Sequence, residues 1–233
     1  SPAFAEALAE YAGYFVSDAF GATHRAHASV VGVAALLPCY AGLLLEKELA
    51  AMQWGLSPQQ PSLLILGGAK FATKEALLHA ALDRYDVVAL GGALANDFLK
   101  AAGHEVGESL VSSTGENVAA LLKSEKLLLP KDVVVVRGGT QRTVPVDAIE
   151  KDEKIVDIGP ETVELIGKEI VTAETIIWNG PMGLYEGGFT DATKSIAQYV
   201  AKETGESLVG GGDTVAAIRE LGLADQFSFL STG

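Results

Sequence analysis

The chain has 233 residues, of which 48% are hydrophobic and 20% are charged, and its formal net charge is -13 at pH 7. This composition is typical of a globular protein with one or two domains and enough apolar mass for a large core. Neutralising a nucleic-acid backbone requires a surplus of Lys and Arg, so the acidic balance argues against nucleic acid as a partner.

The single cysteine, Cys39, cannot form an internal disulfide and makes a cysteine-based metal cluster implausible. We interpret it as a small packing residue in a protein of a reducing compartment. No charged segment followed by an apolar one opens the chain, and no apolar stretch is long enough to span a bilayer. We therefore expect a cytoplasmic protein with no membrane partner.

The first elements in the chain are predicted to be a helix at 1–13, with Pro2 in its first turn, and a short buried strand at 14–17. A loop at 18–29 follows. After Pro38, a long helix is predicted from about residue 39 to 54, and its apolar positions recur on more than one face, as in a hinge or spacer between domains. The chain opens without a methionine and stops just after a strand-like FSFL segment, so we expect the protein to continue beyond both ends.

The remainder alternates strand and helix. The predicted strands are at 63–66, 87–90, 176–178 and 207–209, and the helices that follow them are at 73–82, 93–102, 191–204 and 214–221. This alternation predicts an α/β fold, a Rossmann-like parallel sheet with helices on both faces, which binds ligands at the carboxyl ends of its strands. Segments 127–129, 133–136 and 142–146, with Gly138 and Gly139 in a turn, predict a small antiparallel insertion at one edge.

Four of the strands end in glycines and then open into a helix. The segments are LILGGAK ending at Lys70, VVALGGALAN ending at Asn96, IIWNGPMG ending at Gly183 and LVGGGDT ending at Thr214. A strand-to-helix turn can need glycine for a positive φ whether or not a ligand is present. Glycine also lets phosphate oxygens approach backbone N–H groups at a helix N-terminus, and four such turns in one chain indicate a nucleotide.

Charged residues accompany these turns. Lys70 and Lys74 lie four residues apart at the start of a helix. They are either solvated surface lysines or a pair that holds an anion. A bound anion would offset the unfavourable interaction of two cations with the positive end of the helix dipole. Asp213 follows three glycines, so it is either an N-cap or a ligand of Mg²⁺ carried by nucleotide phosphates, with Thr214 offering a hydroxyl to those phosphates.

The loop at 18–29 concentrates His24, Arg25 and His27. A capping or core role is the default for a histidine, but three cationic side chains within four residues of an acidic chain suggest anion recognition. Arg25 is the strongest candidate, because its fork suits a phosphate or a carboxylate.

The sequence contains neither G-x-x-x-x-G-K-[ST] nor G-x-G-x-x-G, which argues against a Walker-type NTPase and a dinucleotide dehydrogenase. Instead the chain closely resembles the phosphoglycerate kinases. The resemblance is carried by SDAFGATHRAHASVVG at 17–32, LGGAKFATK at 66–74, WNGPMGLYE at 178–186, GGGDTVAAI at 210–218 and FSFLSTG at the end. These segments occur in the family's order and cover essentially the whole chain.

The family folds as two α/β domains, the first holding 3-phosphoglycerate and the second Mg-ADP or Mg-ATP. The resemblance implies that residues 1–37 are the last segment of the N-terminal domain, 38–56 the hinge helix and 57–233 the nucleotide-binding domain. Most of the acid-binding domain would then lie outside this chain. The full-length protein is expected to be a monomer.

The resemblance also implies site residues. Lys70 resembles the lysine that follows the transferred phosphoryl group, Asp213 the Mg²⁺ contact, and Arg25 one of the arginines that grip the acid substrate. His24 and His27 would share that substrate patch. The residues expected to bind the nucleotide are Gly68, Lys74, Gly91, Gly92, Asn179, Pro181, Leu184, Glu186, Gly211, Gly212 and Thr214, with Glu186 on the ribose hydroxyls.

The implied activity is that of a glycolytic phosphotransferase, with direct, reversible in-line transfer between 1,3-bisphosphoglycerate and Mg-ADP that gives 3-phosphoglycerate and Mg-ATP. Catalysis would rest on positioning and charge stabilisation by Lys70, Arg25, Mg²⁺ and helix-end N–H groups. The alternative is that this chain is an isolated nucleotide-binding module without turnover. Arg137 is expected where the family often places an aromatic near the adenine, which leaves the nucleoside preference open.

Overall fold

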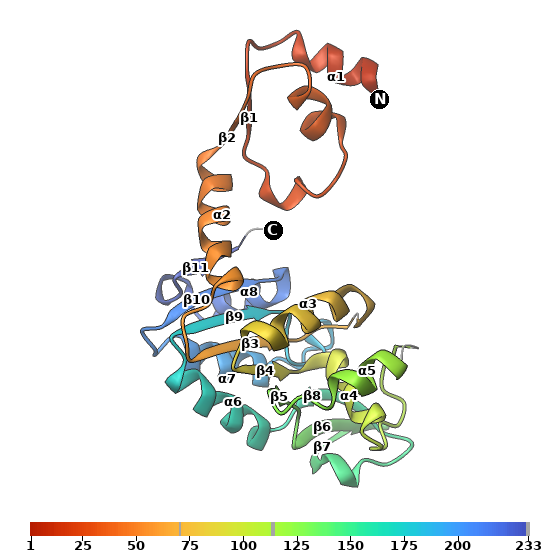
Figure 1. Cartoon of the computed structure of the whole chain (residues 1–233). Coiled ribbons are helices and arrows are strands. Elements are labelled where there is room, and N and C mark those ends of the chain that lie inside the picture. The colour runs from red at the N-terminus through yellow and green to blue at the C-terminus, as the bar shows by residue number, and fades with distance from the viewer. Residues whose placement is uncertain (70, 113–114, 232–233) are drawn as a thin grey trace. The chain divides into compact units, whose positions relative to one another are not determined.

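The computed structural model describes residues 1–69, 71–112 and 115–231, and Figure 1 shows the elements in chain order. The chain divides into two compact units, which we describe separately. Unit 1 comprises Ser1–Gln53 with Ser231, and unit 2 comprises Trp54–Leu230.

Unit 1 is the smaller of the two units. Helix α1 (Pro2–Ala9) precedes two short parallel strands, β1 (Phe15–Ser17) and β2 (Cys39–Ala41). Between the strands lie a 3-10 turn, η1 (Phe20–Ala22), and a π-helical turn, η2 (Ala28–Gly32).

The long helix predicted from about residue 39 is α2 (Leu43–Leu56), which begins four residues later than expected. Residues 39–41 instead pair with β1. Asp18 sets the start of the helix, since its Oδ1 accepts hydrogen bonds from the backbone N–H of Leu44 at 2.7 Å and of Leu45 at 2.9 Å. A helix needs such acceptors for its first N–H groups, and here the acceptor comes from a loop far away in the sequence.

Unit 2 confirms the Rossmann-like parallel sheet. Its six strands are all parallel and lie in the order β11-β10-β9-β3-β4-β5. The strands are β3 (Ser62–Leu66), β4 (Val87–Leu90), β5 (Leu127–Leu128), β9 (Thr175–Asn179), β10 (Glu206–Gly210) and β11 (Phe229–Leu230). Along the chain, β3, β4 and β5 extend the sheet to one side, and β9, β10 and β11 then extend it to the other side. The topological switch point therefore lies between β3 and β9. Ligands of doubly wound folds bind at such a point, outside the carboxyl ends of the strands.

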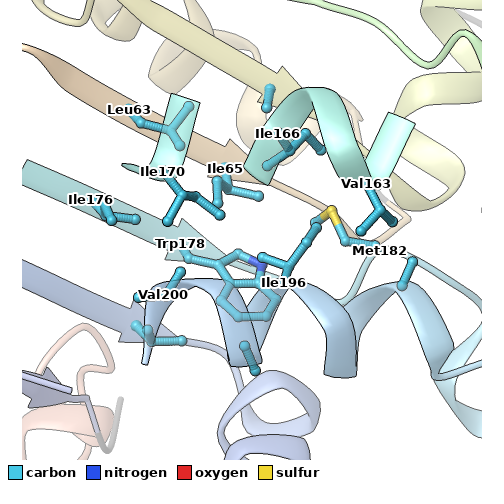
Figure 2. Packing of buried hydrophobic residues seen from close by; sticks show 14 of the residues in the cluster. Leu63, Ile65, Val163, Ile166, Ile170, Ile176, Trp178, Met182, Ile196 and Val200 are labelled. Atoms are coloured by element: carbon cyan, nitrogen blue, oxygen red, sulfur yellow. The ribbon is translucent and has the colours of Figure 1, made fainter. Parts of the chain in front are cut away.

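Helices cover both faces of this sheet, as predicted. The helices are α3 (Phe71–Arg84), α4 (Gly92–Ala101), α5 (Gly115–Leu121), α6 (Pro160–Thr172), α7 (Asp191–Val200) and α8 (Gly212–Glu220). Because side chains alternate along a strand, Leu63 and Ile65 join one core while Leu64 and Leu66 join the other. The first core includes residues of α6, α7 and α8 packed around the fully buried Trp178 (Figure 2), and the second includes residues of α3, α4 and α5.

A second, antiparallel sheet in unit 2 has the order β7-β6-β8, with β6 (Asp132–Arg137), β7 (Thr140–Pro145) and β8 (Lys154–Ile158). The small antiparallel insertion is therefore confirmed, but residues 127–129 were assigned to it wrongly. Leu127 and Leu128 pair in parallel with β4 at the edge of the main sheet.

The third strand of the antiparallel sheet is β8, which the sequence analysis missed together with α6. The signal was present in IVDIGPET, an apolar run that ends in Gly159 and places Pro160 at the first helical position. Over the part of the chain that the structure describes, no helix combines the length and the apolar character that crossing a membrane requires.

Candidate functional site

The glycine turns after β3, β4 and β9 pack onto one another at the switch point. Gly67 N–H donates to the Asn179 carbonyl at 2.9 Å, and Gly68 N–H donates to the Pro181 carbonyl at 3.0 Å. The turn after β4 joins them, because Gly92 N–H donates to the Met182 carbonyl at 2.7 Å. Three segments that are distant in the sequence thus form one backbone surface.

Glycine is required in this surface for structural reasons. Gly92 has φ +60°, and a Cβ there would lie 2.6 Å from the Gly68 nitrogen. Gly180 has φ +92°, and a Cβ there would lie 2.7 Å from the Gly67 carbonyl oxygen. Both a left-handed conformation and close backbone contacts exclude a side chain, so the conformational explanation of these glycines holds whether or not a ligand binds.

A cleft of about 380 Å³ lies at this end of the sheet. We divide its lining into a backbone wall, made of the glycine turns with Gly68 and Gly92, and a side-chain wall, made of residues from α4, β6, β8 and the segment 184–186. Six of the predicted nucleotide and metal residues line the cleft: Gly68, Gly92, Pro181, Leu184, Glu186 and Asp213. The structure therefore brings together residues from four separate glycine-marked segments.

The start of α8 presents polar groups at this site. Gly211 precedes the helix with φ +96°, and Asp213, in its first turn, is exposed and lines the cleft. Thr214 is fully buried, and its Oγ1 has no hydrogen-bond partner among the described residues. A buried hydroxyl without a partner is uncommon, because its desolvation is uncompensated.

Lys74 lies on α3 and is half-buried. Its Nζ donates to the Gly67 carbonyl oxygen, so the ammonium group lies against the turn after β3. Burial lowers the pKa of Lys74, which indicates a cation held away from water. The other predicted lysine, Lys70, lies outside the described residues.

Four more predicted residues lie beside the cleft without lining it. Asn179 ends β9, and a Cβ on Gly210 would lie 3.1 Å from its Nδ2. Gly91 N–H donates to the Leu66 carbonyl at 2.9 Å, and Gly211 approaches Gly180. Gly212, the first residue of α8, faces open space.

Two buried polar residues of the cleft were missed by the sequence analysis as site residues. Asn96, on α4, is 2% exposed, and Asp157, on β8, is 5% exposed. The Asp157 carboxylate accepts hydrogen bonds from Ile158 N–H at 3.0 Å and from Ala192 N–H at 3.2 Å. Burial, opposed by these two bonds and reinforced by Asp191, raises the pKa of Asp157 to about 7. A carboxyl inside the apolar run IVDIG was the available signal.

The loop residues His24, Arg25 and His27 belong to unit 1 and are exposed. Arg25 Nε donates to His24 Nε2 at 3.2 Å, so these two side chains lie together. None of the three is among the residues that line the cleft in unit 2.

Arg137, which the family resemblance led us to expect near the adenine, is not among the residues that line the cleft. It pairs with Glu150 at 2.5 Å and with Asp152 at 3.2 Å on the antiparallel sheet. These carboxylates hold the pKa of Arg137 above its ordinary value. The sequence could not show this, since its partners follow 13 and 15 residues later in a separate turn.

The residues at the start of α8 can serve a metal ion only in part. No group of three or more His, Cys, Asp or Glu side chains that could hold a metal occurs among the described residues. Asp213 forms no ion pair with any residue that the structure describes. A lone carboxylate fits Mg²⁺ that brings water and phosphate ligands of its own, and it does not fit an all-protein metal cage.

The strand order, the packed glycine turns and the cleft at the switch point place the chain in the doubly wound α/β class. A family model described as phosphoglycerate kinase matches residues 1–233, so the chain belongs to the phosphoglycerate kinase family.

Similar proteins agree with this assignment. The chain is 48% identical over 242 residues to a phosphoglycerate kinase of Thermomicrobium roseum and 47% identical over 241 residues to one of Rubrobacter xylanophilus. These matches include 99% and 100% of this chain, respectively, but only 62% of each relative, so the chain spans less than two thirds of their length. Phosphoglycerate kinase structures from Coxiella burnetii and Pyrococcus horikoshii each superpose with a TM-score of 0.85, at 40% and 28% identity, over 100% of this chain and 63% of theirs.

Proposed function

We propose that the cleft binds Mg-ADP or Mg-ATP and that the protein to which this chain belongs is a glycolytic phosphoglycerate kinase. The observation that carries the proposal is the fully buried Thr214 hydroxyl, which lacks a described partner at the start of α8 and beside the glycine turns. A phosphate oxygen is an acceptor for that hydroxyl, and a helix N-terminus favours its charge.

The remaining contacts follow from the walls of the cleft. Phosphates would lie near the start of α8 and the Lys74 ammonium group, whose desolvated charge strengthens their attraction. The base would enter the apolar part between α4 and β8. Glu186 lines the cleft in the turn η4 (Tyr185–Gly187) and would accept hydrogen bonds from the ribose hydroxyls. Asn179 and the glycines 68, 91, 92, 211 and 212 would form the frame around the nucleotide.

Asp213 is the residue that would hold Mg²⁺. The chemistry supplied by Mg²⁺ at such a carboxylate is neutralisation of the charge on nucleotide phosphates. Burial, together with the nearby carboxylates of Glu220 and Asp213, raises the pKa of Tyr185.

The reaction proposed for the whole protein is direct in-line transfer. An oxygen of the ADP β-phosphate attacks the phosphorus of the acyl phosphate in 1,3-bisphosphoglycerate, and the acyl P–O bond breaks as the new P–O bond forms. The products are ATP and the carboxylate of 3-phosphoglycerate, and no phosphate is attached to the protein. Arg25, with His24 and His27, would bind the acid substrate, and Lys70 would follow the transferred group; these roles derive from the family resemblance.

This chain alone is proposed to bind nucleotide with little turnover. The chain spans about 62% of its relatives' length, and we expect most contacts to the acid substrate to come from the remaining part of those proteins. Substantial turnover of 1,3-bisphosphoglycerate by this chain would overturn that view while leaving nucleotide binding intact.

Calorimetric titration with Mg-ADP tests the proposal. We expect saturable binding that weakens about 10- to 100-fold in Lys74→Met, because a charged hydrogen bond to phosphate is lost. Lys126→Met is a matched control, since Lys126 is also half-buried and its Nζ donates to a backbone carbonyl, that of Leu82 at 2.7 Å, away from the cleft. Absence of binding, or equal weakening in both variants, would contradict the assignment of this cleft.

A further inference from the structure

Among the buried cleft-lining residues that the structure describes, Asn96 has the one uncharged polar side chain. It lies on α4 and is 2% exposed. Its Nδ2 donates to the Leu110 carbonyl oxygen at 3.1 Å, whereas its Oδ1 has no hydrogen-bond partner among the described residues. The side chain therefore offers one buried acceptor without a partner.

The hydrogen bond to Leu110 fixes which way the amide faces. A carbonyl oxygen can only accept, so the Asn96 nitrogen must point toward Leu110 and the oxygen away from it. Asp157, the other buried polar side chain of the cleft, already accepts two backbone N–H groups. Among the buried side chains described in the cleft, Asn96 Oδ1 is the oxygen that has no hydrogen-bond partner at all.

The surroundings of Asn96 are apolar, with Leu99, Val133 and Ile155 among the lining residues. An unpaired amide oxygen in such a place costs free energy comparable to a lost hydrogen bond. A ligand that donates a hydrogen bond here removes that cost, whereas a ligand that offers only an acceptor or a carbon atom does not.

The chemistry of a nucleotide restricts the donor to its base. Phosphate oxygens are acceptors at neutral pH and favour the glycine turns, and the ribose hydroxyls are assigned to Glu186 in the proposed binding mode. The base that carries an exocyclic amine at position 6 is adenine, while guanine and hypoxanthine carry a carbonyl oxygen there.

We propose that Asn96 Oδ1 accepts a hydrogen bond from the 6-amino group of adenine, so that the cleft favours a purine with an amine at that position over one without it. This inference rests on the proposed function, because it requires a nucleotide in the cleft. Asn96 reads a single donor, since its nitrogen is occupied by Leu110. The selectivity is for the amine, not for the whole edge of the base.

The test compares Mg-ADP with the Mg complex of purine riboside 5′-diphosphate, which differs from ADP only in lacking the 6-amino group. For the unaltered chain we expect ADP to bind about tenfold more tightly in calorimetry, the size of one buried hydrogen bond. In Asn96→Leu, which keeps the volume and removes the acceptor, the ratio of the two dissociation constants should fall to about 1.

Asp97→Asn is the matched control. Asp97 is the next residue on α4, is 6% exposed, and its Oδ1 accepts from Ser112 N–H at 2.5 Å, but it does not line the cleft. This variant perturbs the same contact between α4 and the segment around 110–112 and should keep the tenfold preference.

Each outcome decides the question. Equal affinity of the unaltered chain for both nucleotides overturns the role of Asn96 and leaves nucleotide binding standing, and this comparison does not depend on any variant folding. The role of Asn96 is also overturned if Asn96→Leu still prefers ADP over the purine riboside diphosphate. It is overturned as well if Asp97→Asn loses that preference. If neither nucleotide binds, the proposed function itself fails and the inference fails with it.

Discussion

The two walls of the cleft are built in different ways. The wall formed by the turns after β3, β4 and β9 is backbone packed on backbone, with N–H to carbonyl distances of 2.7 to 3.0 Å and no space for a Cβ at Gly92. The side-chain wall, formed by β6 and β8 with α4 and the segment 184–186, presents side chains to the cleft, and the antiparallel sheet carries ion pairs such as Arg142–Glu153 on other surfaces. The backbone wall approaches a ligand mainly through its peptide groups, whereas the side-chain wall can select a ligand through individual side chains.

The largest expected effect comes from a carboxyl buried in the side-chain wall. Burial raises the pKa of Asp157 to about 7 from an ordinary value of 3.8, so the folded chain keeps a proton that the unfolded chain releases. The stabilising effect of that proton is full below about pH 4 and is lost as the pH rises through about 7. Relative to Asp157→Asn, the unaltered chain should lose up to roughly 4 kcal/mol of unfolding free energy between pH 4 and pH 8. Urea unfolding of both proteins at pH 4 and pH 8 measures this loss. If the unfolding free energies of the unaltered chain and of Asp157→Asn changed equally with pH, the carboxyl would already be ionised in the folded chain.

The next effect separates the backbone wall from an ordinary turn. Gly92→Ala should destabilise the fold by about 3 kcal/mol, because a left-handed conformation and a backbone clash add together. Gly138→Ala is the control, since Gly138 has φ +53° but nothing within 4 Å of an added Cβ, and it should cost only about 1 kcal/mol. Equal costs in urea unfolding would mean that close packing of the glycine turns contributes nothing.

A smaller effect concerns Thr214, where stability and binding should change in opposite directions. Thr214→Val removes a buried hydroxyl without a described partner, so the unfolding free energy should stay the same or rise slightly. Mg-ADP should nevertheless bind about tenfold more weakly, because one hydrogen bond to phosphate is lost. A variant that is both less stable and equally able to bind would mean that the hydroxyl serves the fold instead.

The smallest effect is expected on the outer surface of the antiparallel sheet. Arg137 is 47% exposed at its side chain and pairs only with exposed carboxylates among the described residues. Arg137→Ala should leave Mg-ADP affinity unchanged and alter the unfolding midpoint little, since exposed ion pairs contribute little. A marked loss of affinity would place Arg137 back beside the base, as the sequence first suggested.

The contrast between the backbone wall and the side-chain wall also explains which features could be predicted from the sequence. The glycine-marked strand ends, the parallel sheet and its helices follow from local patterns, because apolar runs and glycines act over a few residues. The start of α2 could not be predicted, since it depends on Asp18, which precedes Leu44 by 26 residues. The acceptor on Asn96 was missed for a similar reason, because its availability depends on where the Leu110 carbonyl lies. Function in the side-chain wall is set by contacts that only the fold creates.

The measurement that tests the central claim most directly is a crystal structure of this chain with Mg-ADP. We expect the diphosphate at the start of α8 within hydrogen-bond distance of Thr214 Oγ1 and Lys74 Nζ, with the base between α4 and β8 and its amine on Asn96. A nucleotide bound outside this cleft, or one whose phosphates leave Thr214 without a partner, would contradict the account.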